Sequence, residues 1–176
     1  MLITKSQAYE LELLETFRHM QTRQLQWFML RWGLPAEAFE RDMRQLRYLG
    51  KVMLLGDYIC LPGRPRDDAL IASLNIMMCF SMHAIPEFAL GKPPARLVFF
   101  PMDEQCTKAF RVIPVQAGRE RITAAQAEGE YDPGSEILLY IVERPEQMKL
   151  IGHAFPCYFA FPGDKPNAYR FVKWKG

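Results

Sequence analysis

Apolar residues recur with helical spacing through the segment from Pro35 to Gly50. Phe39, Met43 and Leu46 fall on one face at about 100° per residue, which predicts an amphipathic helix. Proline is tolerated at the first position of a helix, and glycine commonly follows the last. The pattern therefore predicts a helix bounded by Pro35 and Gly50.

A shorter helix is predicted just before this one. Thr22 is a suitable N-cap for a helix that runs to about Leu30, and residues 32–34 then form a brief turn. The core candidates of this helix are Leu25, Phe28 and Met29.

A hairpin pattern follows the second helix. The apolar runs 51–55 and 58–61 flank Gly56-Asp57, and glycine supplies the positive φ that a two-residue hairpin turn requires. Helix, helix and hairpin in this order and with these short spacings predict a winged helix-turn-helix, a fold that mostly holds DNA.

The chain begins with a further helix, capped by Thr4 or Ser6 and running to about His19. Its apolar positions suit the remaining helix of a winged-helix core. Its outer side is expected to be acidic and to face away from DNA, and His19 is expected to lie partly exposed near the helix end. The acidic residues are Glu10, Glu12 and Glu15.

Residues 62–66, rich in proline, glycine and arginine, have the composition of a linker. Asp67 then caps a helix that ends before Pro86 and is apolar almost all round. Such a helix is buried, either at the centre of a second domain or in a homodimer interface formed by residues 69–84.

Strand and helix patterns alternate after this helix. Strands are predicted at 96–101, 108–115, 136–143, 157–161 and 168–174, and helices at 119–128 and 145–153, with 87–96 as a loop. This order indicates a small α/β domain on a mixed sheet. The predicted fold class is α+β, with a winged-helix domain at 1–63 and the α/β domain at 67–176.

Composition fits a globular protein, with 49% hydrophobic residues and no apolar run long enough to cross a membrane. The N-terminus lacks the pattern of a signal peptide. The four cysteines are far apart and show no metal-ligand spacing, so we expect them to be reduced and mostly buried in a cytoplasmic protein.

The outer face of the helix at 35–50 carries the side chains expected to contact DNA. They are Arg41, Arg44, Gln45 and Tyr48. Arginine and glutamine match the edges of guanine and adenine in the major groove. The alternative is an ordinary amphipathic helix with a solvated polar face.

Further contacts with the phosphate backbone are expected from Lys51, Arg23 and Arg64, and from the hairpin tip. Residues 1–66 hold ten Lys or Arg and seven Asp or Glu, a net charge of +3, and the remainder is at −1. This bias is mild for a DNA-binding domain, and Asp57 at the tip would repel phosphate.

The segment FERDMRQLRYLGKV, the run TRQLQWFM and the hairpin together resemble the winged-helix head of replication-relaxation proteins of plasmids and conjugative elements. They are also similar to short uncharacterised Clostridial proteins with the same head. The resemblance implies a restriction-endonuclease-type fold for the tail, which is the α/β domain at 67–176.

A nuclease site of that fold needs an acid at one strand end and an acid-x-lysine on the next strand, to hold a divalent metal. Asp103, Glu104 and Glu143 are the only candidates, and the lysine is missing, so a degenerate, non-catalytic tail is the preferred interpretation. No phosphate-binding or hydrolase motif occurs, His83 and His153 are isolated, and no cofactor or metal is expected.

The sequence thus predicts a protein that binds double-stranded DNA in a sequence-specific way, as a regulator or a replication or transfer accessory factor of a mobile element. The alternatives are a winged-helix scaffold for protein–protein interaction and a metal-dependent nuclease.

Overall fold

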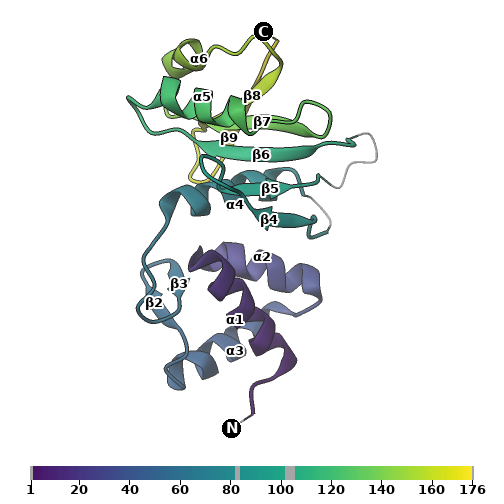
Figure 1. Ribbon diagram of the computed structural model, residues 1–176. Helices are drawn as coiled ribbons and strands as arrows, with labels where there is room; N and C mark the ends of the chain where they lie inside the picture. The colour runs from purple at the N-terminus through teal and green to yellow at the C-terminus, as the bar shows by residue number, and fades with distance from the viewer. Residues whose placement is uncertain (1, 82–83, 102–105, 176) are drawn as a thin grey trace. The chain divides into compact units, whose positions relative to one another are not determined.

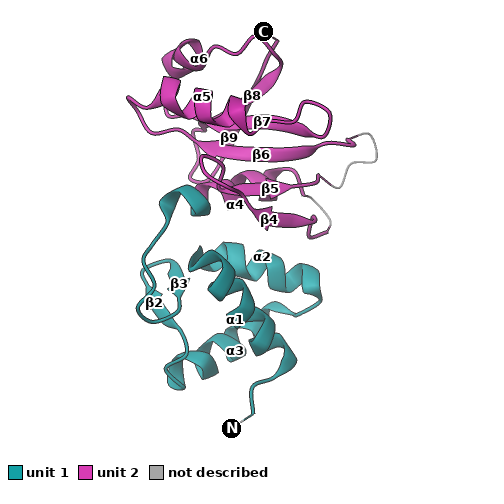
Figure 2. Cartoon of the chain, in the orientation of Figure 1, with its two compact units in different colours: residues 1–71 teal, residues 72–176 magenta. Residues whose placement is uncertain are grey.

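The computed structural model describes residues 2–81, 84–101 and 106–175. The chain divides into two compact units, residues 1–71 and 72–176, each with its own sheet (Figures 1 and 2). Six helices and two sheets occur in the described residues, which confirms a mixed α and β protein. None of these helices combines the length and the apolar character that a membrane crossing needs.

The first unit contains the predicted order of helix, helix and hairpin, preceded by one further helix and a short strand. Its elements are α1 (Lys5–Phe17), β1 (His19–Gln21), α2 (Thr22–Trp32), α3 (Ala36–Tyr48), β2 (Met53–Leu55) and β3 (Tyr58–Cys60). The three strands form an antiparallel sheet in the order β1-β3-β2. A two-residue turn, with Gly56 at φ +60°, joins β2 to β3 as the sequence predicts.

The first helix begins as predicted and ends earlier. Thr4 is its N-cap, with a reciprocal capping box to Gln7. The helix ends at Phe17 because Arg18 adopts a positive φ, and the chain turns into β1. His19 lies two residues after the end of α1, in β1, where it pairs with Cys60. It is buried, so the expectation that it is partly exposed was wrong.

The caps of α2 and α3 are each shifted by one residue from the prediction. Gln21, rather than Thr22, is the N-cap of α2, and the backbone N–H of Gln21 donates to the side chain of Gln24. Pro35 is the N-cap of α3 rather than its first residue. Gly50, at φ +65°, follows the end of α3 as predicted.

Apolar side chains from all three helices and the sheet form the core of the first unit. The predicted core faces are confirmed: Phe28 and Leu46 are fully buried, and Phe39 and Met43 are nearly so. The largest fully buried members are Leu14, Phe17, Met20, Leu25, Phe28, Met29 and Leu46.

Helix α4 (Asp68–Cys79) leads into the second unit. The carboxylate of Asp67 accepts the N–H of Leu70, which confirms the predicted cap. The helix ends at Cys79, well before Pro86, and the rest of the predicted helix falls partly on residues 82–83, outside the described residues. Leu74 and Met77 are fully buried by their own chain, so α4 offers little apolar surface to a second copy.

The second unit is built on a six-stranded mixed sheet. Its elements are β4 (Phe88–Leu90), β5 (Leu97–Phe99), β6 (Ala109–Pro114), α5 (Glu120–Gly129), β7 (Glu136–Ile141), α6 (Glu146–Ile151), β8 (Cys157–Pro162) and β9 (Tyr169–Trp174). The strand order follows the chain from β4 to β9. Strands β6, β7 and β8 run parallel, and the outer pairs are antiparallel. Every predicted strand and helix of this unit is present, but β4 lies in a segment predicted to be a loop.

Helices α5 and α6 connect the parallel strands and lie on the same face of the sheet (Figure 1). Between them and the sheet lies an apolar cluster that includes Tyr140, Cys157 and Phe159, all fully buried. On the other face the ring of Phe80, just after α4, packs at a tilt against that of Phe110, with 4.8 Å between the ring centroids. The sheet is therefore covered on both faces, which suits the apolar central strands.

Candidate nucleic-acid interface

The exposed face of α3 carries two of the predicted arginines and a tyrosine. Arg41, Arg44 and Tyr48 are spaced three and four residues apart, so they lie along one side of the helix. Tyr48 is 89% exposed, and the side chain of Arg41 is 62% exposed. Arg44 is exposed and forms no ion pair with a described residue. These three side chains are available to a partner.

Gln45 does not share this face. Its Oε1 accepts a hydrogen bond of 2.7 Å from Nε2 of Gln7 on α1, and the residue is half-buried. The helical pattern places Gln45 near the edge of the polar face, and the packing of α1 against α3 takes it out of that face. Its role in the structure is to join these two helices.

Lys51 extends the row of positive charge beyond the end of α3. Its side chain is exposed, while its backbone N–H donates to the carbonyl of Leu46 and closes the helix end. Arg64 is exposed in the segment after β3, and Arg23 is half-buried in the first turn of α2.

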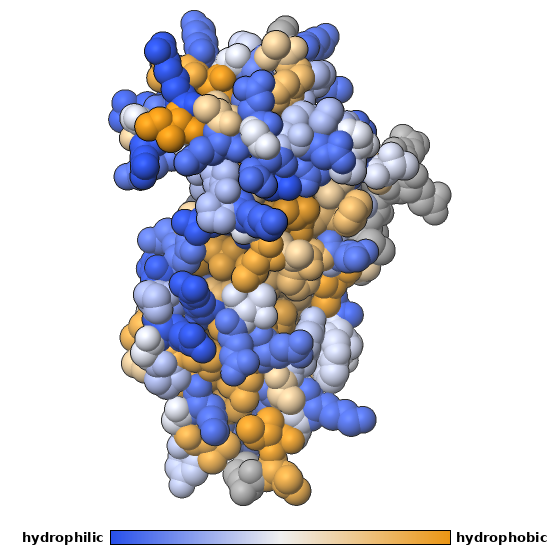
Figure 3. Space-filling model, viewed as in Figure 1, coloured by the Kyte–Doolittle hydropathy of each residue, from blue (hydrophilic) through white to orange (hydrophobic). Residues whose placement is uncertain are grey.

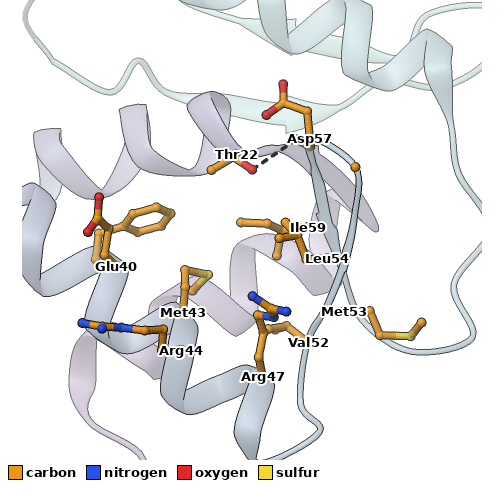
Figure 4. Close-up of a pocket in the computed structure, with 12 residues that line it drawn as sticks. Thr22, Glu40, Met43, Arg44, Arg47, Val52, Met53, Leu54, Asp57 and Ile59 are labelled. Carbon is orange, nitrogen blue, oxygen red and sulfur yellow. Dashed lines mark hydrogen bonds between the residues drawn. The ribbon is translucent and has the colours of Figure 1, made fainter.

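A hollow of about 440 Å³ lies between α3 and the hairpin of β2 and β3 (Figure 4). Its apolar lining comes from both elements, with Phe39 and Met43 on α3 and Ile59 on β3. Arg44 and Arg47 border it on α3. Figure 4 shows the guanidinium of Arg47 turned toward the hollow, whereas that of Arg44 extends outward.

Arg47 is a candidate residue that the sequence reasoning missed. It lies one turn after Arg44 on the side of α3 that faces the hairpin, and it forms no ion pair with a described residue. The signal was its spacing of three residues from Arg44, which places both side chains on neighbouring positions of one helix.

The hairpin itself is apolar and exposed. Met53, Leu54 and Leu55 are between 43% and 49% exposed, and residues 52–63 contain no Lys or Arg. Figure 3 shows orange spheres mixed with blue ones where Figure 1 draws β2 and β3. The tip is held to α2, because the N–H and the hydroxyl of Thr22 both donate to the carbonyl of Asp57, at 2.9 and 3.1 Å.

Two carboxyl groups are buried between α1 and α3. Asp42 is 1% exposed and accepts a hydrogen bond of 2.5 Å from the hydroxyl of Ser6, and Nε of Arg41 lies 3.8 Å from its Oδ1. Glu10 is fully buried, and neither of its carboxyl oxygens has a hydrogen-bond partner among the described residues. The expectation that Glu10 lies on an acidic outer face was therefore wrong.

Burial, and to a smaller extent the neighbouring charge of Asp42, raise the pKa of Glu10 to about 8. At neutral pH this carboxyl is mostly protonated. Of the three glutamates of α1, Glu12 and Glu15 are exposed.

A buried polar pair lies in the second unit. The hydroxyl of Tyr140 and Nε2 of His153 share a hydrogen bond of 2.5 Å. Burial lowers the pKa of His153 and raises that of Tyr140, so both groups are neutral at pH 7. His153 is therefore a core residue whose Nε2 has a hydrogen-bond partner.

Of the three carboxylates considered for a nuclease site, the structure describes only Glu143. Asp103 and Glu104 lie outside the described residues. Glu143 is exposed just after β7, where its N–H and that of Arg144 donate to the side chain of Gln147. Among the residues that the structure describes, no group of three or more His, Cys, Asp or Glu is placed to hold a metal ion.

The cysteines are all free, as expected. Cys60 and Cys157 are buried, whereas Cys79 is exposed and Cys106 is intermediate, so the expectation that most are buried holds for two of them.

Comparisons of this chain with protein families, with curated proteins and with solved structures find no match.

Proposed function

We propose that the first unit is a winged helix-turn-helix that binds double-stranded DNA, with α3 in the major groove. The observation that carries this proposal is the exposed row of Arg41, Arg44 and Tyr48 on α3, immediately beside a hairpin. In such a fold the second helix of the helix-turn-helix contacts base edges, and the hairpin lies along the backbone.

The chemistry of the row suits a groove. A guanidinium donates two parallel hydrogen bonds to O6 and N7 of guanine, and each such pair discriminates by about 1–3 kcal/mol against the wrong base. Arg44 is the better candidate, because no described acidic residue lies within ion-pair distance of it, whereas Nε of Arg41 lies 3.8 Å from Oδ1 of Asp42. Lys51 and Arg64 would contact phosphate and fix the register of the protein on the duplex.

The wider role we propose is that of a regulator, or a replication or transfer accessory factor, of a plasmid or conjugative element. It rests on the resemblance of the head segment to replication-relaxation proteins. The restriction-endonuclease-type fold of the second unit and a homodimer through residues 69–84 stay predictions.

The experiment is fluorescence anisotropy with random duplex DNA at 50 and 200 mM salt. Binding through phosphate should weaken steeply with salt, by about 10³-fold for six contacts. The double variant Arg41→Ala/Arg44→Ala should lose binding at both concentrations. The control Arg119→Ala/Arg121→Ala removes two exposed arginines from the second unit and should bind like the wild type. If the folded wild type fails to bind the duplex DNA at low salt, the proposal is refuted.

The second candidate function is a winged-helix scaffold that binds a protein. The observation that favours it is the exposed apolar surface of Met53, Leu54 and Leu55, since exposed apolar patches commonly mark interaction sites. Its signature differs: binding through apolar surface should change little between the two salt concentrations, and Leu55→Ser should weaken it while leaving any DNA affinity intact.

A further inference from the structure

We propose that the hollow between α3 and the hairpin is a binding site for a small apolar anion. The apolar body would lie on Phe39, Met43 and Ile59, and the anionic group would meet Arg47. This inference concerns a ligand site and does not require that the protein binds DNA.

The size and lining of the hollow match a ligand site. Sites for small molecules occupy about 300–1,000 Å³ and are mostly apolar with a few placed polar groups. This hollow measures about 440 Å³, and its floor consists of side chains that are at least nine-tenths buried, among them Phe39, Val52 and Ile59. An apolar body seated there would remove Leu54, now 43% exposed, from water.

The charge around the hollow favours an anion. Figure 4 shows Arg47 directed toward the space between Met43 and Ile59, while the carboxylates of Glu40 and Asp57 point away from it. Arg47 has no carboxylate partner among the described residues. A guanidinium without a partner beside an apolar surface is a suitable binding group for a carboxylate, which it can hold with two parallel hydrogen bonds.

The site is also held in shape without a ligand. The two hydrogen bonds from Thr22 to the carbonyl of Asp57 tie the hairpin tip to α2, and Gly50 fixes the turn from α3 into β2. Because both walls are already placed, an entering ligand has little ordering cost to offset.

Calorimetric titration of the full chain with decanoate, kept below its micelle concentration, tests the site. Decanoate should bind saturably with one site per chain, and decan-1-ol, which has the same apolar body without charge, should bind at least tenfold more weakly. Arg47→Gln should weaken decanoate by about tenfold. Arg64→Gln removes an exposed arginine that does not line the hollow and should leave the affinity unchanged.

A variant that fills the hollow gives a second, independent test of the site. Leu54→Trp places a large ring in the hollow and should abolish binding, whereas Leu55→Trp changes a neighbouring exposed residue that does not line it and should bind normally. Circular dichroism establishes that each variant is folded. Leu54 tolerates a larger side chain because it is already half exposed.

Three results would overturn the proposal: no saturable binding by the wild type, equal binding by Leu54→Trp, or equal affinity for decanoate and decan-1-ol. A wild type that sediments as a dimer, and becomes a monomer in Leu54→Trp, would assign the hollow to a second copy of the chain instead. If DNA binding is also observed, decanoate should compete with it, because the ligand occupies the space beside Arg44. The competition experiment requires that the proposed DNA binding is correct, whereas the calorimetric titration with decanoate does not.

Discussion

Replacement of the buried carboxyl on α1 should change how the first unit responds to pH. Glu10 is fully buried beside Asp42, and its pKa is raised to about 8. In the unfolded chain a glutamate titrates near its ordinary value, about 4.3. The folded state therefore holds the proton more tightly, and stability is greatest below the unfolded pKa and falls as pH rises toward the folded one.

The size of the effect follows from the two pKa values. One pKa unit corresponds to about 1.4 kcal/mol, so raising the pH from 6 to 8 should lower the free energy of unfolding of the first unit by roughly 2 kcal/mol. Glu10→Gln keeps the shape of the side chain and cannot ionise. It should therefore lose this dependence and exceed the wild type in stability at pH 8.

The assay is urea unfolding at pH 6, 7 and 8, followed by tryptophan fluorescence. In a Trp174→Phe background only Trp27 and Trp32 remain, and both lie in α2, so the signal reports the first unit. Glu15→Gln, an exposed change on the same helix, serves as the control and should keep the slope of the wild type.

Two outcomes would refute this reasoning: equal stability of the wild type at pH 6 and pH 8, or an unchanged slope in Glu10→Gln. His19 does not mimic the effect. Its pKa is lowered, mainly by burial and then by Arg66, so its contribution is lost as pH falls, which is the opposite direction.

Two further predictions concern stability. Tyr140→Phe removes the hydrogen-bond partner of buried His153 and should cost about 1–3 kcal/mol in thermal unfolding; an unchanged melting temperature would contradict this role. Gly50→Ala places a Cβ at φ +65° and should cost about 1–2 kcal/mol, whereas Gly129→Ala, at an open helical position, should stay within about 0.5 kcal/mol. Equal costs for the two glycine changes would show that φ is not the cause.

Local signals made much of the fold predictable. The helix cap, predicted at Thr4 or Ser6 and found at Thr4, the turn at Gly56 and the stop at Gly50 each depend on residues a few positions apart, and all three are confirmed. The short strands were missed for the opposite reason. Residues 19–21 and 88–90 are three-residue strands whose extended form comes from pairing with β3 and β5, which no local pattern reveals.

The candidate site was predictable only as far as one helix face. The periodicity of α3 places Arg41, Arg44 and Tyr48 outward, and the structure agrees. Gln45 and Glu10 were misplaced because α1 packs along the edge of that polar face and buries polar groups there. The hollow beside Arg47 depends on how closely the hairpin approaches α3. The periodicity of one helix does not predict the distance between that helix and another element.

The strand order of the second unit bears on how the chain folds as it is made. Each strand from β5 to β9 pairs with the strand before it, so the sheet can grow one strand at a time as successive segments leave the ribosome. The strands of the first unit cannot pair in the order in which they are synthesised. Strand β1 contacts only β3 in its sheet, and therefore His19 must wait, unpaired, until Cys60 has been synthesised. We expect the three helices to collapse first and the small sheet to close last, with β1 as the strand that completes the unit.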